Sequence, residues 1–171
     1  MGLWETSRPL FYIQNAINNQ EVLMEVKNVQ VTGSLTLTLR KADGAVEVCR
    51  KDNIIVSSGF DAICDSLGKT SGRPSAFGYI ALGTGATAPA IGQTALVSEI
   101  ARQAATYAHV AGTQVMTFSS TFGPGAATGA ITEAGVFNAS SAGTMLDRVL
   151  FNVINKGEND TLTAQFQFTL S

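Results

Sequence analysis

The turn Gly83-Thr84-Gly85, within the stretch IALGTGATAP, is the first place where residue types and spacing suggest chemistry. Two glycines two positions apart after an apolar run are typical of turns whose backbone N–H groups cradle a phosphate. A dinucleotide-binding turn also needs a glycine three residues further on, and Ala88 stands there. The GKT at residues 68–70 does not form a P-loop either, because Ile63 occupies the position of its first glycine. We therefore expect no nucleotide and no other cofactor, and interpret these two glycines, together with Gly135, as residues that shape the backbone.

The side chains that catalysis or metal binding would need are sparse. His109 is the only histidine, and no recognisable nucleophile turn accompanies it. Cys49 and Cys64 are too few for a metal site and are interpreted as reduced thiols. Asp61 and Asp65 lie one helical turn apart, where solvated carboxylates are expected. The sequence predicts no catalytic residues and no bound metal, and hence a protein that is not an enzyme.

Glu133 is the charge with the most informative surroundings. The stretch AITEAGVF reads as a strand that places Glu133 on the same face as Ile131 and Phe137. A lone buried carboxylate costs several kcal/mol, so it needs a partner. Arg102 and Arg148 are the other charges in apolar surroundings, and either could supply a structural ion pair. The alternative is that this face lies outside and Glu133 is solvated.

The elements that position these residues are mostly strands. In the segment TLTAQFQFTL, apolar and polar residues alternate over residues 161–170, the period of a half-buried strand. Asp43-Gly44 between two alternating runs predicts a hairpin. About eight short strands, punctuated by turns, predict a mainly β fold, either an antiparallel β-sandwich or a Greek-key barrel.

Two helical segments are expected beside the strands. Residues 58–67 predict a covering α-helix, with Ser57 or Ser58 as its cap and an inward apolar face at Phe60, Ile63, Cys64 and Leu67. Residues 95–101 predict a short helical turn, with Leu96 and Ile100 facing inward.

The N-terminal residues show no periodicity. We expect residues 1–20 to form an extended arm that docks on its own domain or on a neighbouring subunit, and residues 21–171 to form a single β-sandwich domain. The apolar residues that would anchor the arm between subunits are Trp4, Leu10, Phe11, Tyr12 and Ile13. The sequence shows neither a signal peptide nor a membrane span, so no membrane partner is expected.

The charge content limits the possible partners. Eleven basic residues stand against 13 acidic ones, a balance that does not attract nucleic acid. Only 14% of the residues are charged, against about 25% in an ordinary soluble domain. Because charged residues are depleted at the core of protein interfaces, we infer a surface covered by neighbours in a permanent assembly. The alternative is a neutral Thr- and Ser-rich surface without such a role.

Several segments, in this order, resemble a module of tailed-bacteriophage structural proteins. They are KDNIIVSSGFDAICDSLG, IALGTGATAPAIGQTALVSEIAR, TFGPGAATGAITEAGVFNA and GTMLDRVLFNVINKGENDTLTAQFQFTL. The chain is similar over about residues 50–170 to the N-terminal domain of tail-collar fibre proteins. The matching residues are Asn53, Gly59, Ile80, Gly83, Gly85, Thr94, Ala95, Leu96, Glu99, Arg102, Glu133, Ala134, Gly135 and Phe137.

The resemblance implies a virion structural protein that is assembled in the host cytoplasm. Collar fibres continue into a shaft and a receptor-binding tip, whereas this sequence stops after the final strand of the module. We therefore expect a capsid decoration or cement protein, a homo-oligomer with a trimer as the favoured form, whose partner is the major capsid protein. The alternatives are a tail-fibre or baseplate adaptor, with tail or baseplate proteins as partners, and, in another class, a carbohydrate-binding module.

Overall fold

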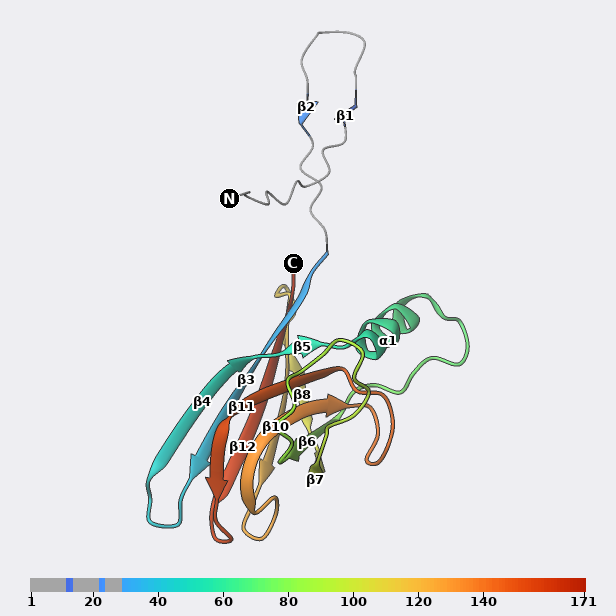
Figure 1. Cartoon of the computed structure of the whole chain (residues 1–171). Helices are drawn as coiled ribbons and strands as arrows, with labels where there is room; N and C mark the ends of the chain where they lie inside the picture. The colour runs from blue at the N-terminus through green and yellow to red at the C-terminus, as the bar shows by residue number, and fades with distance from the viewer. Residues whose placement is uncertain (1–11, 14–21, 24–28) are drawn as a thin grey trace, which may run out of the picture.

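The structure, a computed structural model, describes residues 12–13, 22–23 and 29–171. It is mainly β, with two five-stranded antiparallel sheets packed as a sandwich and a single described helix (Figure 1). The strands are β1 Tyr12–Ile13, β2 Val22–Leu23, β3 Val31–Arg40, β4 Val46–Asp52, β5 Ile54–Ile55, β6 Tyr79–Gly83, β7 Glu99–Ala104, β8 Thr106–His109, β9 Val115–Phe122, β10 Gly129–Phe137, β11 Asp147–Lys156 and β12 Thr161–Leu170, and the helix is α1 Ser57–Gly68. The sandwich predicted from strand periodicity is confirmed.

At both sides of the sandwich, a one-residue connection joins an edge strand of one sheet to an edge strand of the other. Sheet I has the order β5-β11-β10-β6-β7, and sheet II has the order β4-β3-β12-β9-β8. The chain passes from sheet II to sheet I at Asn53 and returns at Ala105. β1 and β2 pair with each other in a separate two-stranded ladder.

The core between the sheets comes from the alternating apolar residues. In β12, Leu162, Ala164, Phe166 and Phe168 are buried, as the period of two predicts. They pack against apolar residues of β3, β9, β10 and β11 in one cluster. On the other face of sheet II, β12 presents its polar residues, which alternate with the buried ones.

The hairpin predicted at Asp43-Gly44 joins β3 and β4. Gly44 has φ +93°, in the left-handed region that glycine tolerates best. The Asp43 carboxylate accepts a hydrogen bond from the Ala45 N–H at 2.9 Å, which closes the turn.

The outer face of sheet I is covered by loops. Residues 84–98, called here the covering loop, bring Leu96 onto Ala81 and Phe137, which face away from the main core. The loop between β10 and β11 contributes Met145 to the same small cluster. The outer face of sheet II has no such cover among the described residues.

The helical turn expected at residues 95–101 is absent. Strand β7 begins at Glu99, and the residues before it are irregular. The N–H groups of Val97 and Ser98 donate to the Glu133 carboxylate, so they do not enter helical hydrogen bonds. Leu96 is buried as predicted, whereas Ile100 is exposed.

α1 has the predicted extent but not the predicted inward face. Its buried residues are Gly59 and Ala62, while Phe60 is 39% and Leu67 81% exposed. A Cβ on Gly59 would collide with the Leu146 carbonyl oxygen, so this glycine lets the helix lie close to the backbone before β11. Neither serine caps the helix, because Val56 is the N-cap residue and makes no side-chain cap. Of the four predicted inward residues, only Ile63 packs against the core, where it is half-buried, while Phe60, Cys64 and Leu67 are exposed because the closest contact is made through the smallest residues.

Candidate functional site

The Gly83-Thr84-Gly85 turn ends β6 and opens the covering loop. Neither glycine has a positive φ, so a special backbone conformation does not explain them. A Cβ on Gly83 would lie 2.6 Å from Glu133 Oε1 and from the Ser98 carbonyl oxygen. A Cβ on Gly85 would collide with the Glu133 carboxylate and lie 2.6 Å from Val97 Cβ. The two glycines therefore make room for a buried carboxylate of the protein itself, in the place where a phosphate-binding turn would hold its ligand.

The Glu133 carboxylate is fully buried and accepts five hydrogen bonds. Oε1 accepts from the N–H groups of Gly85, at 2.9 Å, and Ser98, at 2.7 Å. Oε2 accepts from the Val97 N–H at 3.0 Å and from the Arg148 guanidinium at 2.9 Å and 2.7 Å. We call these groups the Glu133 hub.

Arg148 supplies the positive charge of the hub and is also fully buried. Besides Glu133, its guanidinium donates to the Gln93 side-chain oxygen and to the Thr87 carbonyl, each at 2.9 Å. Of the two arginines considered as partners, Arg148 forms the ion pair with Glu133. The pair ties the covering loop to β10 and β11 at several points along its length.

Arg102 makes a separate set of contacts. Its guanidinium donates to the Glu99 carboxylate at 2.6 Å and to the carbonyls of Ala139 and Ala142. It also stacks on the Phe137 ring, with Cζ 3.7 Å from the ring centroid. Arg102 thus holds the loop after β10 rather than the Glu133 carboxylate.

The pKa of Glu133 shows how well the hub matches an ionised carboxylate. Burial raises the pKa, but the N–H groups of Ser98, Val97 and Gly85 and the Arg148 guanidinium together lower it below its ordinary value. Because the carboxylate and the guanidinium are each occupied by partners within the chain, the hub is suited to fixing a loop and not to transferring protons.

Gly135, the third predicted turn glycine, lies within strand β10 and not in a turn. It too is required by a close backbone contact. A Cβ there would lie 2.6 Å from the Asp147 carbonyl oxygen on the neighbouring strand. Glycine at this position allows β10 and β11 to remain in contact where β11 begins.

A second buried carboxylate, Asp147, was not singled out from the sequence. Its Oδ1 accepts from the Val136 N–H at 3.0 Å, and its Oδ2 accepts from the Asn53 side-chain amide at 2.6 Å. Complete burial raises its pKa to about 7, although both hydrogen bonds lower it. Asp147 stands at the start of a strand, where hydrophobic periodicity does not show that a carboxylate will be buried. Its partner, the Asn53 side-chain amide, is 94 residues away in the sequence and reaches it only in the folded chain.

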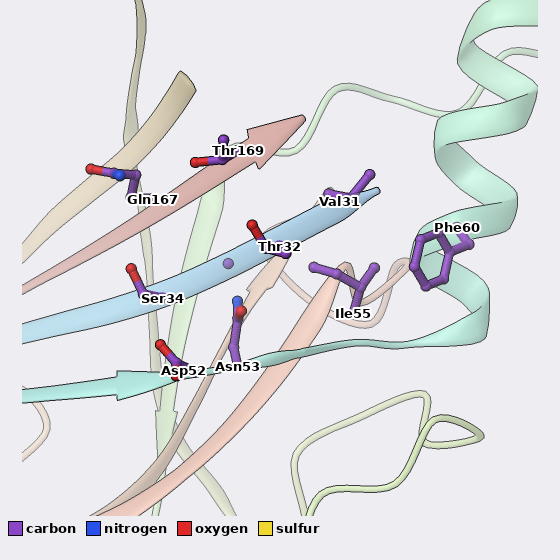
Figure 2. Close-up of a pocket in the computed structure, with 10 residues that line it drawn as sticks. Val31, Thr32, Ser34, Asp52, Asn53, Ile55, Phe60, Gln167 and Thr169 are labelled. Carbon is purple, nitrogen blue, oxygen red and sulfur yellow. The ribbon is translucent and has the colours of Figure 1, made fainter. Parts of the chain in front are cut away.

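A groove of about 500 Å³ lies beside this crossing, at the end of the sandwich that carries α1. Residues 31–34 of β3 line it on one side, and Asn53, Ile55 and Phe60 line it on the other (Figure 2). Figure 2 shows Asn53 and Ile55 pointing from the crossing segment toward β3, with the Phe60 ring beside Ile55. The Asn53 side-chain oxygen is buried and has no hydrogen-bond partner among the described residues. It lies against Gly33, where a Cβ would collide with the amide.

The groove also contains an open strand edge. Pairing between β3 and β4 ends at Ser34 and Asp52, and the last backbone bond joins the Asn53 N–H to the Gly33 carbonyl at 3.1 Å. In an antiparallel strand the N–H and C=O of one residue point to the same side, and alternate residues share that side. The Val31 N–H and C=O therefore point into the groove, where no strand of the described chain pairs with them.

The remaining candidates do not form a reactive cluster. His109 is exposed, with Nδ1 2.8 Å from the Val115 carbonyl oxygen. Cys64 is exposed, Cys49 is half-buried, and both are free thiols. Asp65 pairs with Lys69 at 2.6 Å on the surface of α1. Within residues 12–13, 22–23 and 29–171, no group of three or more His, Cys, Asp or Glu could hold a metal ion, and no helix is long and apolar enough to cross a bilayer.

The predicted arm lies mostly outside the described residues. Trp4, Leu10 and Phe11 are not described, and neither is the expected boundary at residues 20 and 21. Tyr12 and Ile13 form β1 and pair with Leu23 and Val22.

Comparison of the chain with protein-family models, with curated proteins and with solved structures found no significant match.

Proposed function

We propose that this protein is a structural component of a tailed-bacteriophage virion, a capsid decoration or cement protein that stabilises the shell through contacts between subunits. The observation that carries the proposal is the uncharged part of the outer face of sheet II, formed by β12, β9 and β8, beside the charged residues Arg50 and Asp52 of β4. Its central strand, β12, presents Thr161, Thr163, Gln165, Gln167 and Thr169 on that face, opposite its buried apolar residues.

The neighbouring strands extend this face in register. Gln165 lies between Thr36 of β3 and Ser119 of β9, and Ser119 in turn pairs with Thr106 of β8. The whole run of residues 103–132, which includes β8 and β9, contains no Asp, Glu, Lys or Arg. A monomer ordinarily keeps its surface charged to avoid association, and interface cores are depleted of charge. The uncharged area of β12, β9 and β8, which consists mainly of hydroxyl and amide groups, suits a permanent contact with other subunits.

The Glu133 hub supports the same function in a different way. Its ion pair is satisfied entirely from within the chain and fixes the covering loop on the opposite side of the sandwich. A rigid module whose buried ion pair is fully occupied by partners within the chain fits a structural role. The motif resemblance to tail-collar fibre domains directs the proposal to a phage particle, and the expected assembly is a trimer that contacts the major capsid protein.

The tail-fibre or baseplate adaptor is the second candidate, because the resemblance is to a tail module. The number of copies of the protein per particle distinguishes a cement protein from a tail or baseplate adaptor. Quantitative mass spectrometry of purified particles should find the protein in hundreds of copies if it is a cement and in about a dozen if it belongs to the tail. Absence of the protein from particles would overturn both.

The carbohydrate-binding module receives less support. Among the described residues, Phe60 and Tyr107 are the large exposed aromatics, and they line two different hollows. No described surface therefore joins several aromatic rings into one sugar platform.

A substitution on the uncharged face tests the proposal directly. Gln165→Lys places a charge at an exposed position in the middle of sheet II, and Val153→Lys places the same charge at an exposed position on sheet I. Added to particles that lack the protein, the Gln165→Lys variant should bind at least about tenfold more weakly, a loss of about 1.4 kcal/mol, while Val153→Lys should bind normally. Normal binding by the Gln165→Lys variant would count against this face as the contact.

A further inference from the structure

The groove at the end of the sandwich has the features of a site for strand addition. The Val31 N–H and C=O point into it, and no strand among the described residues pairs with them on this side of β3. On its other side, β3 is fully engaged, since Gln30 and Ser171 exchange two backbone hydrogen bonds at 2.6 and 3.0 Å. The unpaired Val31 N–H and C=O therefore belong to a strand that is well held in the sheet. An extended segment could pair with β3 at Val31, beyond the point where pairing with β4 ends at Asp52.

The opening is built into the crossing of the chain. The chain leaves sheet II after Asn53, whose side-chain amide donates a hydrogen bond to the Asp147 carboxylate of sheet I at 2.6 Å. Gly33 has no side chain that would push this amide aside. The edge of β3 at Val31 is thus unpaired because the chain passes from β4 into sheet I at Asn53 and does not continue along β3.

The walls of the groove indicate the chemistry of the segment it accepts. Ile55 and Phe60 form an apolar wall, and Phe60 remains 39% exposed in the single chain. Among the described residues, Asp52 is the one formally charged residue that lines the groove. A strand added here would present apolar side chains to this wall and carry few charges of its own.

The N-terminal segment of the same sequence has that composition. Residues 9–20 contain no Asp, Glu, Lys or Arg and include Leu10, Phe11, Tyr12 and Ile13. This segment precedes Val29, where the described sandwich begins, so it enters the domain at the same end as the groove. In the single chain, Val22 and Leu23 pair with β1 and not with Val31. A segment of 28 residues reaches up to about 90 Å when extended, which is enough to reach a neighbouring subunit.

We propose that the N-terminal segment of a second copy of this chain adds a strand to β3 at Val31, with its apolar residues against Ile55 and Phe60. The inference rests on the proposed function, because it names the contact that would join subunits in the assembly.

Photo-cross-linking of the full-length chain tests where the segment binds. Phe11→benzoylphenylalanine places a photoreactive ring of similar shape in the segment. The variant is prepared with and without ¹⁵N, and the two preparations are mixed, unfolded together, refolded and irradiated. Mass spectrometry should then find cross-links from position 11 to residues 31–34, 55 or 60, with both isotope labels joined in one product.

Each other outcome would overturn the proposal. Cross-links to the groove that join only one label would mean that each chain fills its own groove. Cross-links elsewhere, in a protein that still forms oligomers, would overturn strand exchange but leave the proposed assembly in place. A monomer at every concentration, without mixed-label products, would overturn both the exchange and the self-association in the proposed function.

Two pairs of variants test the contacts. Phe60→Glu should weaken self-association at least about tenfold, whereas Leu67→Glu, on the same helix but away from the groove, should leave it within about twofold. Val31→Pro removes the N–H that faces the groove and leaves the bonds of Gln30 and Thr32 to β12, whereas Val31→Ala keeps that N–H. Analytical ultracentrifugation should find association weakened by the proline but not by the alanine, with melting temperature as the check on folding. Equal association of the paired variants would contradict strand addition.

Discussion

Arg148 Nη2 lies 2.7 Å from Glu133 Oε2, and both side chains are fully buried on neighbouring strands of sheet I. The pair is surrounded by the N–H groups of the covering loop, so it joins segments that are far apart in the sequence. Removing one member leaves the other charged and buried, which makes the pair a strong determinant of stability.

Glu133→Gln should destabilise the fold by about 3 kcal/mol, because the neutral amide no longer balances the Arg148 guanidinium. In a domain of this size, that corresponds to a melting temperature lower by about 10 °C. Differential scanning calorimetry measures the change. Asp65→Asn, which breaks the exposed pair with Lys69, is the control and should alter stability by less than about 1 kcal/mol. An equally small effect of Glu133→Gln would show that the pair does not hold the loop.

The pKa of Glu133 predicts how the fold responds to acid. Since the folded carboxylate has a lowered pKa, its stabilising contribution is present above the ordinary value near 4.5 and is lost as the pH falls through the folded value. Urea unfolding between pH 3 and pH 6 should show stability falling toward acid in the wild type. This fall should be smaller in Glu133→Gln, and parallel curves for the two proteins would contradict the assignment.

Asp147 predicts the opposite dependence. Its pKa is about 7 in the folded protein against 3.8 in the unfolded chain, so between these values the folded state holds a proton that the unfolded state has released. The contribution of Asp147 to stability is fully present below about pH 4 and is lost as the pH rises through about 7. Asp147→Asn should remove this decline because the amide does not titrate, and the fold should tolerate it because the Asn53 amide can rotate to place its unpartnered oxygen toward the new NH₂ group. The comparison is of urea unfolding at pH 5 and pH 8, and an unchanged difference between the two pH values would refute the role of Asp147.

Gly85→Ala should destabilise the protein by about 2 kcal/mol or more, because the added Cβ would collide with the Glu133 carboxylate and with Val97. Gly92→Ala is the matched control in the same covering loop, since a Cβ there has no heavy atom within 4 Å. Chemical denaturation measures both variants. If the two alanines had the same effect, the explanation of the Gly83-Thr84-Gly85 turn by close packing would be wrong.

The strands follow from local pattern, and the helix contact does not. Alternation over residues 161–170 predicts both β12 and its buried face, since a strand needs only a period of two and one apolar side. In α1 the apolar positions predict the helix and the inward place of Ile63, but not the main contact, because Gly59 and Ala62 allow a closer approach to Leu146 than larger side chains do. Helical periodicity depends on the positions of apolar residues and does not show where small residues allow a helix to pack closely.

The sequence by itself indicated that Glu133 needs a positive partner if its face of the strand is buried, and the structure showed that it is buried. The sequence also limited the partner to Arg102 or Arg148. Tertiary structure alone decided between them, because the pairing of β10 with β11 places Arg148 beside Glu133, whereas β7 presents Arg102 to Glu99 and the Phe137 ring. The helix expected at residues 95–101 does not form, because the N–H groups of Val97 and Ser98 donate hydrogen bonds to the Glu133 carboxylate, which is 35 residues from Ser98 in the sequence. Such long-range hydrogen bonds leave no local period in the sequence, which is why only the folded chain shows them.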